Sequence, residues 1–83
     1  LFRLYVAGRS ARSRQAIDNL RRLGDERLGG HYELVVVDVL EDPASAETGR
    51  ILTTPTVVRE HPAPPRRVTG DLSDATRVAD ALD

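Results

Sequence analysis

The chain of 83 residues contains no cysteine, no tryptophan and no methionine, and it has one phenylalanine and two tyrosines. Without cysteine it has no disulfide, no thiolate nucleophile and no Cys-ligated metal. This absence fits a reducing, cytoplasmic environment. The apolar run at 34–37 is far shorter than the ~20 residues that a membrane-spanning helix needs. The composition therefore excludes thiol chemistry and does not indicate a membrane protein.

Lysine is also absent, so all 12 basic residues are arginine, against 13 acidic residues and a net charge of −1. Arginine pairs bidentately with carboxylates, which suits protein interfaces. A codon preference for arginine explains the same bias. Because no basic stripe is interleaved with aromatic residues, we expect no nucleic-acid partner. The length predicts a single domain over residues 1–83, of marginal stability.

The beginning of the chain predicts a strand followed by a helix. Apolar and polar residues alternate over 1–7 with a period of two, which is typical of a strand. A helix then runs to about Leu28. Ser10 or Ser13 is placed to cap its start, and the glycines at 29–30 end it.

The middle of the chain predicts a second strand and a short helix. The continuously apolar run at 34–37 predicts that the strand at 32–40 is covered on both faces. With the preceding elements it forms a right-handed βαβ unit with parallel strands. Asp42 followed by Pro43 is a strong start for a helix, which Gly49 would end early.

The last third predicts two strands and a closing helix. Pro55, within the segment 51–58, blocks one ladder hydrogen bond and therefore belongs at the first residue or the edge of a strand. Residues 66–69 are placed to return antiparallel to that strand. Asp71 or Ser73 is predicted to cap the final helix, whose apolar residues recur at helical spacing.

The order βαβαββα predicts an α/β, thioredoxin-like fold. Thioredoxin-like proteins carry a proline, usually in cis, just before their third strand, and Pro55 matches that position. Redox members of that fold have Cys-x-x-Cys at the start of the first helix. Here the corresponding residues, 10–13, are Ser-Ala-Arg-Ser. Disulfide exchange is therefore impossible for this chain.

Other chemistry finds little support. His31 and His61 have no second metal ligand at useful spacing and are expected to be surface residues. Asp71 and Asp74 resemble a carboxylate pair, but acidic groups favour a helix N-terminus, so capping is the preferred interpretation. No phosphate-binding glycine loop is present. We therefore expect no metal, no cofactor and no catalytic residue.

Four segments together resemble the KaiB family of bacterial clock proteins. The resemblance lies in Leu4–Gly8, Val37–Leu40, Ile51–Thr56 and Arg66–Asp74, and it extends over essentially the whole chain. The most diagnostic part is Gly-Asp-Leu-Ser-Asp at 70–74, after a proline-rich turn and two arginines. This run is usually missing from the related sensor domain of clock histidine kinases.

The resemblance implies a binding protein and not an enzyme. KaiB proteins bind the ring ATPase KaiC and modulate its phosphorylation cycle. They also capture KaiA in that complex and compete with clock histidine kinases. Two alternatives remain open, namely the KaiB-like sensor domain of a histidine kinase and a stress-related homologue from a non-cyanobacterial species. An enzyme of the thioredoxin superfamily that works without cysteine is a third, for which no residue speaks.

The family is also metamorphic. A thioredoxin-like monomer binds KaiC, and a ground state, usually a homotetramer, rearranges the C-terminal half. The resemblance assigns this switch to Pro55, Gly70, Asp71, Ala81 and Asp83. Ala81 stands where the family often has glycine, and alanine favours a helix, so we expect the thioredoxin-like state to dominate. The chain stops at Asp83 without the family's acidic tail, which we expect to weigh against the tetramer.

Partner-binding positions are carried over from the family to the second strand, the second helix region and the basic pair. These positions are Glu33, Val35, Leu40, Glu41, Arg50, Arg66 and Arg67. At Glu33 and Val35 many members have a small and a basic residue. Because charge complementarity sets partner choice, we expect a partner that differs from the cyanobacterial one. A solvated turn is the alternative for Arg66 and Arg67.

Overall fold

The computed structural model describes residues 1–82, so Asp83, one of the expected switch positions, lies outside the described residues. The predicted order βαβαββα is confirmed. The elements are β1 (Phe2–Val6), α1 (Ala11–Leu28), β2 (Leu34–Asp38), α2 (Pro43–Thr48), β3 (Thr56–Arg59), β4 (Arg66–Thr69) and α3 (Ala75–Leu82).

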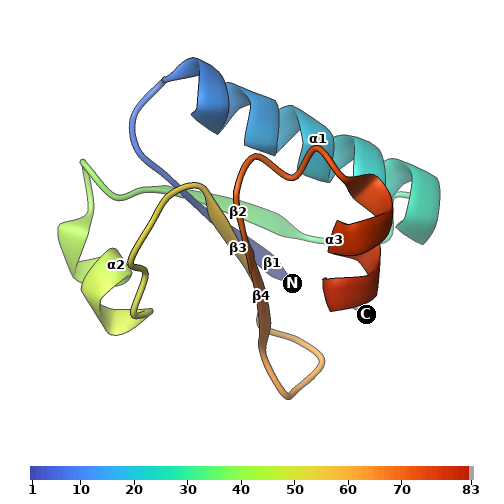
Figure 1. Cartoon of the computed structure of the whole chain (residues 1–83). Helices are drawn as coiled ribbons and strands as arrows, with labels where there is room; N and C mark the ends of the chain where they lie inside the picture. The colour runs from blue at the N-terminus through green and yellow to red at the C-terminus, as the bar shows by residue number, and fades with distance from the viewer. Residues whose placement is uncertain (83) are drawn as a thin grey trace.

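The four strands form one mixed sheet in the order β2-β1-β3-β4. β1 pairs parallel with β2, with Leu4 opposite Val36, and antiparallel with β3, with Leu4 opposite Val57. β4 returns antiparallel to β3, with Val68 opposite Val57. The parallel pair and the antiparallel return strand are both as predicted. The helices α1 and α3 lie together over one face of this sheet (Figure 1).

Helix α1 begins and ends where its local chemistry dictates. The Ser10 side chain accepts from the amide of Ser13 at 3.1 Å, so Ser10 is the N-cap, while Ser13 is buried inside the first turn. At the other end Gly29 adopts the left-handed conformation, with φ of 59°. A glycine at this position carries no side chain to clash, which is why the helix stops here.

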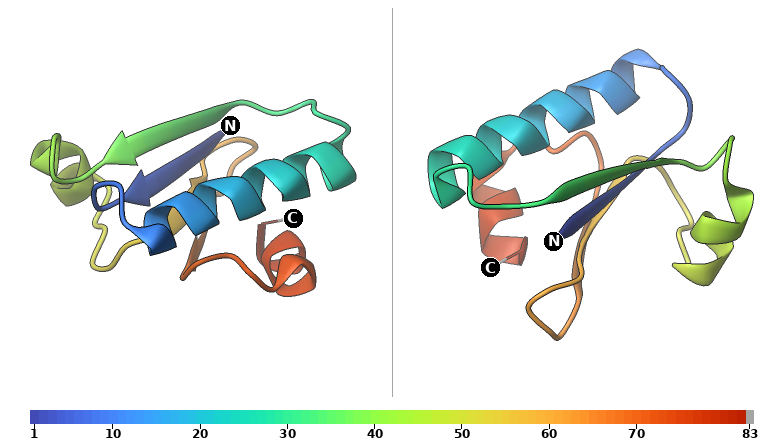
Figure 2. Two further views of the ribbon diagram at one scale, coloured as in Figure 1. Left: turned by 90° about the horizontal axis from the view of Figure 1, so that it is seen from above. Right: turned by 180° about the vertical axis from the view of Figure 1, so that it is seen from behind.

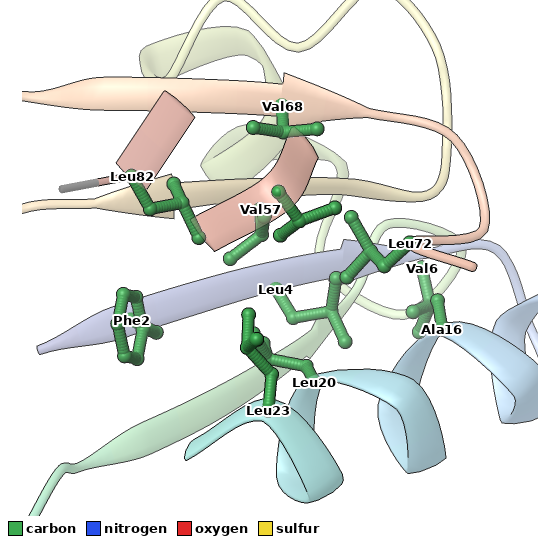
Figure 3. Close-up of a cluster of buried hydrophobic side chains, with 11 residues drawn as sticks. Phe2, Leu4, Val6, Ala16, Leu20, Leu23, Val57, Val68, Leu72 and Leu82 are labelled. Atoms are coloured by element: carbon green, nitrogen blue, oxygen red, sulfur yellow. The ribbon is translucent and has the colours of Figure 1, made fainter. Parts of the chain in front are cut away.

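The hydrophobic core lies between the sheet and the helices α1 and α3. Figure 3 shows Leu4 of β1 lying with Leu20 and Leu23 of α1, and Val57 and Val68 of the neighbouring strands. Leu4 and Val57 are completely buried. The helical spacing of the apolar residues in α1 thus places them on the face of the helix that packs against the sheet. Leu28, the last residue of α1, is 42% exposed.

The prediction that β2 is covered on both faces is wrong. Val35 and Val36 are 37% and 39% exposed. β2 is the outer strand of the sheet, and α2 lies beyond the carboxyl ends of β1 and β2 instead of over the strand (Figure 2). A continuously apolar strand is usually central and covered. Here the same pattern stands at an exposed edge.

The prediction for the cap of the final helix is confirmed in part, because capping was the preferred interpretation for Asp74 as well as for Asp71. The Asp74 carboxylate accepts from the amide of Arg77 at 3.1 Å, so Asp74 caps α3, and neither Asp71 nor Ser73 does. Asp71 instead accepts from the amide of Ser73 at 3.0 Å, and its main-chain oxygen accepts from Asn19 of α1 at 2.8 Å. Asp71 therefore shapes the turn that leads into α3 and fastens it to α1.

Candidate partner-binding surface

The second face of the sheet is partly covered by α2. Tyr5 points to this face and is only 5% exposed, and its hydroxyl lies against Gly49 at the end of α2. A hollow of about 410 Å³ separates α2 from Arg3, Tyr5 and Glu60. Arg3 pairs with Glu60 across its rim. The side-chain hydrogen bond to Glu60 raises the pKa of Arg3.

The outer edge of β2 is unpaired within residues 1–82. The amide of Phe2 donates to the carbonyl of Glu33, and the amide of Val39 donates to the carbonyl of Val6, each at 2.8 Å. In a parallel pair, alternate residues bond to the same neighbour. The main-chain groups of Leu34, Val36 and Asp38 therefore face outward. Such an edge is a template for another strand.

Beyond β2 the chain carries two exposed leucines. Leu40, which precedes α2 in the chain, is 69% exposed, and Leu52, which follows it, is 95% exposed. Leu40 is held over Gly8, where an added Cβ would lie 3.3 Å from its Cδ1 atom. Asp38 fixes this turn, because its carboxylate accepts from the amides of Gly8 at 2.9 Å and Leu40 at 3.0 Å.

We call this region the β2–α2 surface. It is formed by the outer edge of β2, Leu40, Glu41, α2, Arg50 and Leu52.

Helix α2 is closed at both ends by hydrogen bonds. Asp42 accepts from the amide of Ser45 at 3.2 Å, and Pro43 occupies the first turn, as predicted. At the C-terminal end the amide of Ile51 donates to Ala46 and that of Arg50 donates to Glu47, at 2.9 and 3.1 Å. This is the Schellman pattern, with Arg50 at the position that glycine normally occupies.

Arg50 is therefore strained, and Gly49 is not the left-handed residue. The φ of Arg50 is 54°, whereas Gly49 has an ordinary helical φ of −80°. A residue with a Cβ loses roughly 1–2 kcal/mol in the left-handed conformation. Early termination at Gly49 is confirmed, but the conformational cost falls on the residue after it.

Arg67 reaches from β4 to the same helix end. Its guanidinium donates to the carbonyl of Arg50 and to that of Gly49, at 3.0 Å each. Of the predicted contact residues, the structure thus brings Arg50 and Arg67 together. Arg67 thus contacts main-chain carbonyls of the same molecule, at the end of α2. The sequence did not indicate this contact.

The remaining predicted residues spread over the molecule. Glu33 precedes β2 and Leu40 lies in the turn after it, so the five residues of the strand separate them. Val35 lies between them. Arg66 is exposed on β4, the opposite edge strand, about 14 Å from β2 across the sheet. The family positions therefore do not form one compact patch; Leu40, Glu41 and Arg50 share the β2–α2 surface, and Arg66 does not.

Two exposed apolar residues of this surface, Val36 and Leu52, were missed by sequence reasoning. Val36 stood in a run that was interpreted as buried. Leu52 follows a short helix and precedes a proline, and no periodicity marks it as exposed. Only the strand order and the path of the loop reveal both residues.

The position of the thioredoxin redox motif carries hydroxyl groups. The Ser10 hydroxyl donates to that of Ser13 at 2.9 Å, and the Ser13 hydroxyl donates to the carbonyl of Ala7 at 3.3 Å. Both serines are thus committed to the start of α1. The Thr54–Pro55 peptide bond before β3 is cis. Within residues 1–82, no three or more His, Cys, Asp or Glu side chains gather as a metal site would require.

Over the same residues no helix is both long enough and apolar enough to cross a membrane.

Two of the solved structures that resemble this chain are thioredoxins. Mitochondrial thioredoxin 3 of Saccharomyces cerevisiae superposes with a TM-score of 0.76 over 98% of this chain and 74% of its own, at 17% identity. Chloroplastic thioredoxin z gives a TM-score of 0.66 over 95% and 77%, at 19% identity. At these identities the likeness establishes the fold. The molecule has a thioredoxin-like fold, and its sequence contains no cysteine.

Comparison of the amino-acid sequence assigns the chain to a particular family. Residues 3–83 match the family described as the KaiB domain. The circadian clock protein KaiB3 of Synechocystis sp. is 43% identical over the whole chain and 81% of its own length. A circadian clock oscillator protein KaiB of Prochlorococcus marinus is 45% identical over the whole chain and 70% of its own length. The chain belongs to the KaiB family.

Proposed function

We propose that this protein is a non-catalytic regulator of the circadian-clock type, which binds a KaiC-type ring ATPase in its thioredoxin-like state and modulates that ATPase's phosphorylation cycle. The observation that carries the proposal is the β2–α2 surface, on which a strand edge unpaired within residues 1–82 is followed in the chain by Leu40 and Leu52, both exposed. The names of the relatives, which are clock proteins, support the same role.

The physical properties of this surface suit a protein partner. An exposed edge strand accepts a partner strand through main-chain hydrogen bonds, and its side chains add specificity. Leu40 and Leu52 supply apolar area, at roughly 25 cal/mol for each Å² that a partner buries. Glu41 and Arg50 stand beside them with opposite charges, which favour a partner of complementary pattern. KaiA-type proteins and clock histidine kinases are further candidates for the same edge.

A change of fold is the second part of the proposal. The thioredoxin-like state acts as a monomer. It competes with a ground state in which the C-terminal half is rearranged and which can form a homotetramer. Ala81 is half-buried in α3 and packs against the core, and Gly70 has a φ of 107° at the end of β4. Together with Pro55 and Asp71, these residues lie in or next to the segments that such a rearrangement would move.

Binding is tested by size-exclusion chromatography of the protein with a purified KaiC-type ATPase, with ATP and with ADP. We expect co-elution with the wild type and its loss on Leu40→Glu, which places a charge on the β2–α2 surface. Leu28→Glu is the matched control, because Leu28 is also an exposed leucine but lies at the far end of α1. The proposal is wrong if the wild type fails to co-elute under every nucleotide condition.

Strand addition at β2 has a test of its own. Val36→Pro removes an amide that points outward, whereas Val37→Pro removes one that belongs to the ladder with β1. We expect the first variant to fold and to lose partner binding, and the second to lose stability. Normal binding by Val36→Pro would exclude strand addition and leave the leucines as the contact.

A further inference from the structure

The end of α2 combines a strained residue with a bond that comes from a distant part of the chain. Arg50 has a φ of 54° although it has a full side chain, and it occupies the glycine position of a Schellman motif. Glycine stands next to it at position 49, so the chain places the flexible residue one position away from where it would relieve strain. Strain of this kind persists only where surrounding contacts enforce it.

Besides the backbone bonds of the motif, Arg67 contacts this helix end through its side chain. Its two terminal nitrogens donate to the carbonyls of Gly49 and Arg50, at 3.0 Å each, across 18 and 17 residues of sequence. Those carbonyls belong to the end of a helix, where main-chain oxygens lack intrahelical partners and attract a cation. The planar guanidinium suits two neighbouring oxygens, which an ammonium group would not match.

The neighbouring arginine provides a contrast. Arg66 stands on the same strand, and because successive residues of a strand point to opposite faces, its side chain is directed away from α2. Arg66 is exposed, and its side chain makes no hydrogen bond within residues 1–82. Of the two arginines, only Arg67 is built into the fold.

We infer that Arg67 is a positioning residue: it holds Arg50 in the left-handed conformation, and so presents the exposed Arg50 guanidinium to a carboxylate on the partner of the β2–α2 surface. This inference rests on the proposed function for the partner, but the bond itself does not. Glycine at position 50 would close the helix with less strain, and it would leave no guanidinium to present. At position 50, glycine would therefore favour the stability of the helix end, whereas arginine favours binding of the partner.

The first test measures hydrogen exchange of the amides at 49–51 in the protein alone. We expect Arg67→Gln to accelerate this exchange about tenfold, the factor that a lost hydrogen bond to a charged group predicts at its weaker end. Arg67→Lys should give a smaller acceleration, and Arg66→Gln none. In an Arg50→Gly background the Arg67→Gln change should have less effect, because glycine adopts positive φ without help.

The second test measures affinity for the KaiC-type ATPase. Arg50→Gly should weaken binding about tenfold, as expected on losing a charge-assisted contact, while exchange at 49–51 stays slow. Arg67→Gln should weaken binding too, and Arg66→Gln should not. A purely structural role for Arg67 predicts that Arg50→Gly binds normally.

The outcomes separate the two proposals. Exchange that is unchanged in Arg67→Gln, or accelerated equally in the Arg50→Gly background, overturns the positioning role. Altered exchange with unaltered binding overturns the presentation of Arg50. If the wild type itself binds no KaiC-type ATPase, the proposed function and the presentation of Arg50 to that partner fail, and the exchange measurement still decides whether Arg67 holds the helix end.

Discussion

The guanidinium of Arg59 in β3 donates to the main-chain carbonyl of Leu82 in the last turn of α3, at 2.6 Å. Its other terminal nitrogen donates to the carbonyl of Pro64, at 3.1 Å. The cation therefore meets the C-terminal end of a helix, where unpaired carbonyls and the helix dipole both favour it. One side chain joins the central antiparallel strand, the β3–β4 turn and the final helix.

We expect Arg59→Gln to destabilise the protein by about 1.5–3 kcal/mol, because hydrogen bonds to a charged group stabilise by that amount. Urea denaturation followed by circular dichroism measures the free energy of unfolding. Arg66→Gln serves as the control, since this arginine is exposed on the adjacent strand. Equal stability of both variants and the wild type would show that the bond to Leu82 contributes nothing.

Ala81→Gly is expected to raise the population of the second fold. Glycine in a helix is less favourable than alanine by ~1 kcal/mol, which is about a fivefold change in a two-state ratio. New NMR resonances for residues after about 40, or a concentration-dependent increase in mass by ultracentrifugation, would report the second state. Ala11→Gly is the control, because it causes a similar loss of helix propensity in α1, which both folds share in the proposal. A single set of resonances in Ala81→Gly would count against a fold switch governed by α3.

Gly24 lies in the middle of α1, where alanine would ordinarily be stabilising by ~1 kcal/mol. In this structure an added Cβ would lie 2.4 Å from a ring carbon of Tyr32. The ring would have to leave its place beside Phe2, at a cost of about 1–3 kcal/mol for overpacking. We therefore expect Gly24→Ala to lower the melting temperature.

The reason is tested by repeating the substitution where the clash is absent. In a Tyr32→Ala background, Gly24→Ala should raise the melting temperature, so the effect changes sign. Destabilisation of the same size in both backgrounds would assign the cost to the helix itself and not to the aromatic ring.

Asp71 makes the β4–α3 connection sensitive to acid. The Ser73 hydroxyl and then the Ser73 amide stabilise the carboxylate and lower the pKa of Asp71 in the folded protein. A pKa that is lower in the folded than in the unfolded state contributes stability above the unfolded value, and this contribution disappears as the pH falls through the folded value. We expect stability to decline with acid below about pH 4, where an unfolded aspartate begins to bind its proton.

Asp71→Asn should remove that part of the pH dependence, and an NMR titration of the Asp71 carboxyl should show the lowered pKa directly. Ser73→Ala should move the pKa back towards its ordinary value. An Asp71 carboxyl that titrates like an unfolded aspartate in the intact protein would contradict the hydrogen bonds seen here.

Much of the fold was predictable because its signals are local. The N-cap at Ser10, the stop at Gly29 and the Asp42–Pro43 start each depend on neighbouring residues only. The cap of α3 was predicted only in part, because Asp71, Ser73 and Asp74 all have a suitable side chain within four residues. Backbone geometry selects Asp74, and it gives Asp71 the task of shaping the preceding turn.

The candidate surface was only partly predictable. Leu40, Glu41 and Arg50 were expected from resemblance, and the structure places them around α2. The exposure of Val36 and Leu52 depends on where β2 stands in the sheet and on the path of a loop, which hydropathy does not encode. The bond from Arg67 to Arg50 spans 17 residues, and no spacing rule connects them.

The amino-acid sequence by itself determined that this protein performs no thiol chemistry, because it has no cysteine, and it determined the succession of helices and strands, because caps, breakers and periodicity act over a few residues. The tertiary structure alone decided which strand became the exposed edge, which arginine faces solvent and which one holds a helix end. Those outcomes depend on strand order and on side chains that meet across the sheet, and such contacts exist only once the chain has folded.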